Sequence, residues 1–250
     1  MIEQELQGLV QEKHVRLLYA CESGSRAWGF ASPDSDYDIR FLYVHPKDAY
    51  LRLDSPQDTL DRIIGDLDIS GWDIFKALRL LRKSNPPLME WLFSPVVYAE
   101  NTPYIQELRR IARQAYSSSA VFYHYSRMAY RNYHQYLENR PEVLLKKYLY
   151  VMRPMVALFY LEQFHDLPPT NFIETLESVV LPQGVREGIM GLIDRKQAGH
   201  ELGTGLPDPI LNAFADRHLK EWIQNDPEKD GKKQDFRELD AIALAILNEE

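Results

Sequence analysis

Two aspartates, Asp36 and Asp38, stand one residue apart at the start of an apolar run. Residues 37–44, YDIRFLYV, have the alternation of a β-strand. Side chains alternate across a sheet, so we expect the two carboxylates to point to the same side. Carboxylates held so close repel one another unless a cation lies between them, and their oxygens suit Mg²⁺ or Mn²⁺. The pair therefore predicts a site for divalent metal ions at the start of this strand.

A site for two metal ions needs a third carboxylate from another element. A further strand, predicted over residues 61–69, offers Asp66 and Asp68, and Asp73 follows it. We expect Asp68 to be the third ligand, because it interrupts an apolar strand and a charge there costs stability unless it has a role. Asp66 shares the alternation of Asp68 and is the second choice. Asp73 fits the first turn of a helix, where the helix dipole favours a carboxylate.

Gly24 and Ser25 follow an apolar strand predicted over residues 15–21 and precede the aspartate pair. A glycine lets the backbone approach a ligand closely, and a serine offers a hydroxyl and a backbone N–H to phosphate oxygens. If a short helix begins at Ser25, its free N–H groups face the same anion. Each of these features alone is common. The order of strand, Gly-Ser, Asp-x-Asp and a later aspartate is more specific, and it predicts a phosphate-binding turn beside a metal site.

This order resembles the DNA polymerase β-like nucleotidyltransferase superfamily, whose signature is Gly-Ser followed by Asp-x-Asp and a third carboxylate. Three longer strings look like the predicted nucleotidyltransferases of the YcgL/RlaP type, which are proposed from genome context to act in RNA repair. These strings are GSRAWGFASPDSDYDIRF, DISGWDIFKALRLLRKSNPPLMEWLFSPVVY and KKYLYVMRPMVAL. The resemblance covers about residues 15–160 and leaves open which aspartate is the third.

The resemblance implies transfer of a nucleoside monophosphate from an NTP, such as ATP, to an acceptor hydroxyl, with release of pyrophosphate. Gly24 and Ser25 would hold the β- and γ-phosphates, and Asp36 and Asp38 would hold two metal ions. Asp68 would bind the first metal ion and help to deprotonate the acceptor. The acceptor is expected to be an RNA end, and the alternative is transfer of AMP or another nucleotide to a protein or a small molecule. A nucleotide-binding module without catalysis is disfavoured, because such a module is expected to lose part of the carboxylate set.

Four cationic residues are predicted to contact the nucleotide. Arg26 and Arg40 flank the site in the sequence, and a role as surface charges or carboxylate partners explains them equally well. Lys146 and Arg153 are seven residues apart and share a helix face. Because their string is part of the family resemblance, we expect them to face a cleft and bind phosphate.

The elements that must position these residues differ between the two parts of the chain. The first part alternates strands with helices, and the second has helical periodicity without strong strand signals. The sequence predicts an α+β fold, with a nucleotidyltransferase-type mixed-sheet α/β domain over residues 1–100 and an all-helical, substrate-binding domain over residues 101–250. The predicted helices cover residues 2–13, 71–87, 103–138, 142–165, 170–196 with an interruption at Pro182, 207–224 and 236–249.

Residues 116–136, YSSSAVFYHYSRMAYRNYHQY, interleave aromatic side chains with Arg127 and Arg131. Proteins that bind single-stranded RNA stack its bases on such side chains. The alternative is a helix that packs its tyrosines in a core while their hydroxyls reach water. The packing interpretation is favoured, because aromatic stripes at helical spacing are normally core.

The composition limits the class of protein. A net charge of −8 argues against a clamp for duplex nucleic acid, which is usually basic. No apolar run reaches 18 residues, so we expect neither a membrane span nor a membrane partner. The charged N-terminal segment is unlike a signal peptide, and the single cysteine, Cys21, fits a small core residue in a reducing compartment. The predicted location is the cytoplasm.

Overall fold

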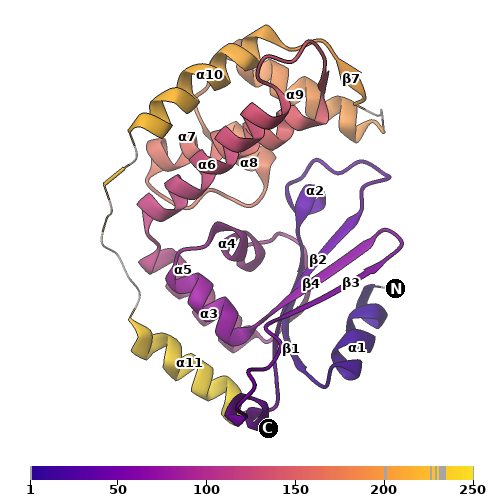
Figure 1. Ribbon diagram of the computed structural model, residues 1–250, viewed down its shortest axis with the longest axis vertical. Coiled ribbons are helices and arrows are strands. Elements are labelled where there is room, and N and C mark those ends of the chain that lie inside the picture. The colour runs from indigo at the N-terminus through magenta and orange to yellow at the C-terminus, as the bar shows by residue number, and fades with distance from the viewer. Residues whose placement is uncertain (1, 200–201, 226, 229, 231–234, 250) are drawn as a thin grey trace. The chain divides into compact units, whose positions relative to one another are not determined.

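The computed structural model describes residues 2–199, 202–225, 227–228, 230 and 235–249 (Figure 1). Contacts between residues divide the chain into two compact units. The sheet unit consists of Met1–Ala27, Ser35–Ser117 and Gly231–Glu250. The helical unit consists of Trp28–Asp34 and Ser118–Asp230.

The sheet unit is built on five strands in the order β3-β4-β2-β1-β5. The strands are β1 (Arg16–Glu22), β2 (Tyr37–Val44), β3 (Thr59–Ile64), β4 (Leu67–Asp73) and β5 (Val97–Glu100). β2 and β4 run parallel, and the pairs β1–β2, β1–β5 and β3–β4 are antiparallel. The sheet is therefore mixed, as the sequence predicts.

Helices cover both faces of this sheet (Figure 1). Along β2, Ile39, Phe41 and Tyr43 belong to one core, to which α1 (Ile2–Glu12) contributes. The residues that alternate with them, Leu42 and Val44, belong to the core on the opposite face. The helices of this second core are α3 (Ile74–Arg82), α4 (Pro86–Leu92), α5 (Thr102–Ala115) and α11 (Phe236–Asn248). Each buried leucine or phenylalanine contributes about 1.5–3 kcal/mol, so burial on both faces fixes the register of the central strand.

Within the helical unit, α7 (Lys146–Phe164) is the central helix and packs against its neighbours α6, α8, α9 and α10. The remaining elements of this unit are α6 (Ser118–Tyr136), α8 (Phe172–Ser178), α9 (Gln183–Gln197), α10 (Pro209–Gln224) and a short ladder of β6 (Val143–Leu144) with β7 (Thr204–Gly205). Segment 28–34 packs here as well, with the Phe30 ring 5.8 Å from that of Phe172. None of the helices in the described part of the chain has the length and apolar character needed to cross a membrane.

The predicted fold class is confirmed, with a mixed sheet in the N-terminal part and helices in the C-terminal part. The contacts do not divide the chain at residue 100, because α5 and α11 pack with the sheet. The division into domains 1–100 and 101–250 stays a prediction.

Three predicted elements are wrong in their extent. The strand expected over residues 61–69 is the hairpin of β3 and β4, since Gly65 takes φ +56° and allows a tight turn. The helix expected over residues 71–87 loses its start to β4 and begins at Ile74, where Asp73 caps it by accepting from the Phe75 N–H at 2.8 Å. The helix expected over residues 103–138 is divided into α5 and α6 at Tyr116, which has extended backbone angles.

Candidate active site

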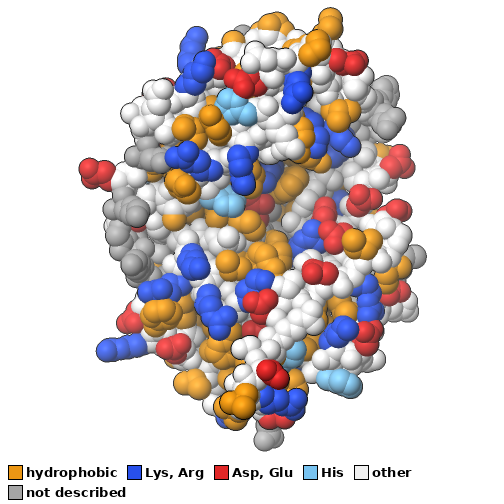
Figure 2. Space-filling model, viewed as in Figure 1, with side chains coloured by type: hydrophobic (Ala, Val, Ile, Leu, Met, Phe, Trp, Pro, Cys, Tyr) orange, Lys and Arg blue, Asp and Glu red, His pale blue; other side chains and the backbone are white. Residues whose placement is uncertain are grey.

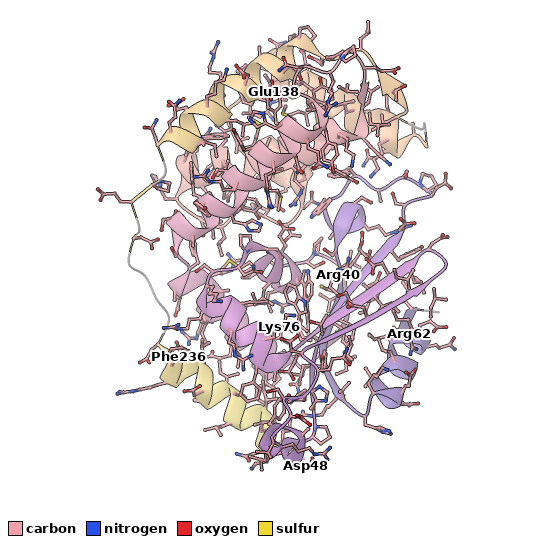
Figure 3. The ribbon with its side chains drawn as sticks, in the orientation of Figure 1. Arg40, Asp48, Arg62, Lys76, Glu138 and Phe236 are labelled. Carbon is pink, nitrogen blue, oxygen red and sulfur yellow. The ribbon has the colours of Figure 1, made fainter. Side chains whose placement is uncertain are left out.

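Asp38 and Asp68 lie side by side at the start of two parallel strands. β2 pairs with β4 so that Asp38 is directly opposite Asp68 and Arg40 is opposite Ser70. Because side chains alternate along a strand, Asp38 and Arg40 share the sheet face of Leu42. The register of a long-range parallel pair therefore brings together the carboxylates that the sequence only suggested. Figure 3 labels Arg40, which lies on the same strand as Asp38.

Arg40 bridges these two carboxylates. Its Nη2 donates to Asp38 Oδ1 at 3.0 Å and to Asp68 Oδ2 at 2.8 Å. Its Nη1 donates to the backbone oxygen of Asp68 at 2.9 Å. The side chain of Arg40 is only 17% exposed, whereas that of Asp68 is 43% exposed. A partly buried guanidinium thus supplies the positive charge that the carboxylates require.

The environment of Asp38 opposes its ionisation. Burial raises the pKa of Asp38, the Arg40 guanidinium lowers this pKa, and the carboxylates of Asp68 and Asp36 raise it. Asp36 and Asp68 therefore both act electrostatically on Asp38. An added cation would relieve their repulsion.

Gly24 makes close contact with Asp38. It has φ +59°, and a Cβ placed on it would stand 1.9 Å from Asp38 Oδ2 and 2.7 Å from Cγ. The neighbouring Ser23 N–H donates to the backbone oxygen of Asp38 at 2.8 Å. The predicted Gly-Ser turn thus lies against the carboxylate, and only glycine leaves room for it. Ser25 is the second residue of the four-residue helix α2 (Gly24–Ala27) and is partly exposed.

Glu22 is a buried carboxylate in contact with Asp38 that the sequence did not lead us to expect. It is 1% exposed, and its Oε1 accepts from the Asp38 N–H at 2.7 Å. The Tyr98 hydroxyl donates to Oε2. Burial raises the pKa of Glu22. A carboxylate at the end of an apolar strand was the available signal, since a buried charge needs partners.

The other candidate carboxylates lie in different places. Asp36 is exposed just before β2. Asp66 is exposed in the β3–β4 turn, where its backbone oxygen accepts from the Tyr37 N–H at 2.8 Å. Asp73 is buried at the far end of β4, where it caps α3 and accepts from the Tyr50 hydroxyl. Of the three candidates for the third carboxylate, the structure thus places Asp68 beside Asp38.

Arg26 lies near the same turn and is held by two contacts. Its Nη2 donates to the Ser35 backbone oxygen at 2.8 Å, and its guanidinium lies 3.8 Å from the centroid of the Tyr37 ring. The Nε atom is buried and has no hydrogen-bond partner among the described residues. This arrangement leaves a buried donor on a cation next to the Gly-Ser turn.

Lys146 and Arg153 belong to the helical unit. Lys146 is exposed at the first position of α7, and Arg153 lies with its guanidinium 4.0 Å from the Trp28 ring centroid. Their phosphate-binding role stays a prediction.

The donor set fits divalent cations by its chemistry. Mg²⁺ and Mn²⁺ prefer carboxylate oxygens, and Asp38, which lies against Gly24, is repelled by the carboxylates of Asp36 and Asp68. Within the described ranges, no three His, Cys, Asp or Glu side chains converge as a metal-binding group. Arg40 lies between two of the carboxylates instead, so its guanidinium must move for both of them to hold one ion.

Comparison with known proteins identifies the family. Residues 1–245 match the RlaP family, described as "RNA repair pathway DNA polymerase beta family". The chain belongs to this family. Membership in the RlaP family, together with the mixed α/β fold, supports nucleotidyl transfer as the class of reaction.

Two relatives illustrate the range of similarity. The chain is 38% identical to the uncharacterized protein YcgL of Bacillus subtilis (strain 168) over 247 residues, which are 98% of this chain and 95% of that protein. A solved structure of a nucleotidyltransferase-like protein from Exiguobacterium sibiricum 255-15 matches with a TM-score of 0.36 and 12% identity. That match covers 89% of this chain and 76% of the other, and a similarity this low supports no conclusion.

Proposed function

We propose that this member of the RlaP family transfers a nucleoside monophosphate from an NTP to an acceptor hydroxyl, with two divalent cations, and that the acceptor is an RNA end. The observation that supports the proposal best is the parallel register of β2 and β4. It brings Asp68 beside Asp38 at the starts of the two strands, where Ser23, next to Gly24, donates to the backbone oxygen of Asp38. The family description supports RNA as the acceptor.

The carboxylates and the Gly-Ser turn have separate roles in this proposal. Asp36, Asp38 and Asp68 would hold Mg²⁺ or Mn²⁺, which supplies the charge that activates the attacking oxygen and stabilises the leaving pyrophosphate. Gly24 and Ser25 bind the β- and γ-phosphates through backbone N–H groups and the serine hydroxyl. Asp68 has the more exposed carboxylate of the bridged pair, and it accepts the proton of the incoming hydroxyl.

The cationic residues orient the nucleotide. Arg26 offers its buried Nε to an anion at the turn. Arg40 is tied to Asp38 and Asp68 here, and it becomes available for phosphate once divalent cations balance these carboxylates. Lys146 and Arg153 are proposed to bind phosphate from the helical unit.

The test incubates the protein with each labelled NTP, with Mg²⁺ or Mn²⁺, and with RNA, protein or small-molecule acceptors. We expect label transfer to an RNA end by the wild type and none by Asp36→Asn/Asp38→Asn, which keeps the shape of both side chains. Asp68→Asn is expected to abolish transfer, whereas Asp66→Asn, in the neighbouring turn, is the matched control and keeps it. Full activity of Asp68→Asn would assign the third carboxylate elsewhere.

The acceptors separate the alternatives. Label on a protein or a small molecule, and not on RNA, would favour nucleotidylation of that acceptor. An intact protein that binds no NTP would refute the catalytic proposal. Location in the cytoplasm stays a prediction.

A further inference from the structure

The outward side of α6 carries aromatic and cationic side chains and no carboxylate. Its 19 residues, SSAVFYHYSRMAYRNYHQY, contain neither Asp nor Glu, although the chain has 37 of them. Tyr123, Arg127, Tyr130, Arg131 and His134 stand at positions i, i+4, i+7, i+8 and i+11, so they share one side of the helix. We name these five residues the α6 stripe.

The α6 stripe is accessible. Tyr123 is 53% exposed and Arg131 is exposed, while the other members are partly exposed. The Arg127 guanidinium lies 5.0 Å from the Tyr123 ring centroid, and the His134 ring lies edge-on to Tyr130 at 4.0 Å. The aromatic and basic side chains of the stripe thus contact one another through a cation–π pair and an edge-on ring pair.

Other sides of α6 do the packing. Tyr125 and Tyr133 are buried, as expected for aromatic residues in a core. Asn132 donates to the Tyr150 backbone oxygen at 2.9 Å, which places α7 on a side away from the stripe. The buried tyrosines of α6, Tyr125 and Tyr133, thus belong to the core of the helical unit, whereas Tyr123 and Tyr130 of the α6 stripe are at least partly exposed.

Within α6 itself, the charged side chains are arginines, and none is a carboxylate. Glu138 follows the end of α6 and pairs with His134. Over the helical part of this face, Figure 2 shows Lys, Arg and His side chains interspersed with apolar side chains, together with several Asp and Glu side chains. In a chain of net charge −8, a helix side with two arginines and no carboxylate is complementary to a polyanion.

We infer that the α6 stripe binds single-stranded RNA, with bases stacked on Tyr123 and Tyr130 and a phosphate paired with Arg131. Stacking on aromatic rings tolerates any base, and it needs bases that are not already paired in a duplex. The stripe extends about 16 Å along the helix, which matches about five stacked nucleotides at ~3.4 Å each. This inference rests on the proposed function, because the RNA bound here would be the strand that carries the acceptor end.

The experiment measures fluorescence anisotropy of a labelled single-stranded RNA of roughly 12 nucleotides. It uses the full chain without NTP or divalent cation. Tyr123→Ala is expected to raise the Kd by roughly fivefold or more, whereas Tyr123→Phe keeps the ring and the affinity. Arg131→Ala is expected to reduce the slope of log affinity against log salt by about 0.7, as for one lost phosphate contact.

Matched controls make the same deletions away from the stripe. Tyr150→Ala and Arg195→Ala remove exposed side chains of the helical unit, and both are expected to leave the affinity unchanged. A duplex RNA, and an abasic strand with the same number of phosphates, are expected to bind more weakly than the single strand.

Several results would overturn the inference. They are an absence of RNA binding by the wild type, an unchanged affinity of Tyr123→Ala, an equal loss in Tyr150→Ala, and equal binding of the abasic strand. Its failure is separable from that of the proposed function, because binding is measured without NTP. Binding through the stripe without label transfer counts against transfer alone, and transfer to RNA with the Tyr123→Ala affinity unchanged counts against the stripe alone.

Discussion

Substitution of Gly24 by alanine tests whether the Gly-Ser turn fixes the position of the Asp38 carboxylate. The added Cβ would stand 1.9 Å from Asp38 Oδ2, whereas ordinary contact begins at 3.4 Å. The carboxylate must therefore move by about 1.5 Å. A misplacement of about 1 Å at a reacting group can already cost about 100-fold in rate. Alanine at φ +59° also costs about 1–2 kcal/mol of stability.

Gly65→Ala is the matched control. Gly65 has φ +56°, and a Cβ there would meet nothing within 4 Å. Both variants are thus expected to lose about 1–2 kcal/mol from backbone strain, which lowers the Tm by about 2–4 °C for each kcal/mol in a chain of this size. Only Gly24→Ala displaces Asp38.

The assay compares both variants with the wild type in label transfer and in thermal unfolding with and without Mg²⁺. We expect Gly65→Ala to keep its kcat/KM. We expect the kcat/KM of Gly24→Ala to fall by at least about 100-fold, and Mg²⁺ should no longer raise the Tm of this variant. Equal activity and equal Mg²⁺ response of the two alanine variants would refute the reasoning, because strain alone would then explain both.

Four further predictions concern single residues. Glu22→Ala leaves the part-buried Asp38 N–H without its acceptor and should cost about 1–3 kcal/mol in urea unfolding, while Glu22→Gln keeps most of this stability. Burial raises the pKa of Cys21 to about 12, so iodoacetamide at pH 8 should label only the unfolded chain, and rapid labelling of the native protein would contradict this. Arg40→Gln should lower the Tm without Mg²⁺ and enlarge the increase that Mg²⁺ produces; an unchanged increase would argue against competition between them. Burial lowers the pKa of His218 below its ordinary 6.5. The contribution of this side chain to stability is therefore complete above pH 6.5 and is lost as the pH falls through the lower pKa of the folded state. His218→Gln should remove that part of the pH dependence of unfolding.

Local patterns predicted the elements around the site because those elements depend on local alternation. The strand over residues 37–44 has the predicted bounds. Alternation along this strand puts Asp38 on the same side of the sheet as Arg40. The hairpin of β3 and β4 escaped prediction. Its apolar residues continue through Gly65, so only the positive φ of that glycine reveals the turn.

The partners of the site carboxylates could not be read from local sequence. Asp68 meets Asp38 through a parallel pairing across 30 residues, and Glu22 meets Tyr98 across 76. Such contacts depend on strand order, which no local period encodes. For Arg40 the sequence left two roles equally open, and the structure shows it as a partner of carboxylates.

The position of Arg40 bears on both roles. It stands two residues after Asp38 on the same strand, so its backbone is fixed on the same side of the sheet. A divalent cation that binds Asp38 and Asp68 can displace the Arg40 guanidinium only as far as the length of that side chain allows. The guanidinium would therefore remain close to the two carboxylates. In the proposed reaction, an NTP bound with divalent cations would bring phosphate to the same place, so the two roles proposed for Arg40 would be successive rather than exclusive.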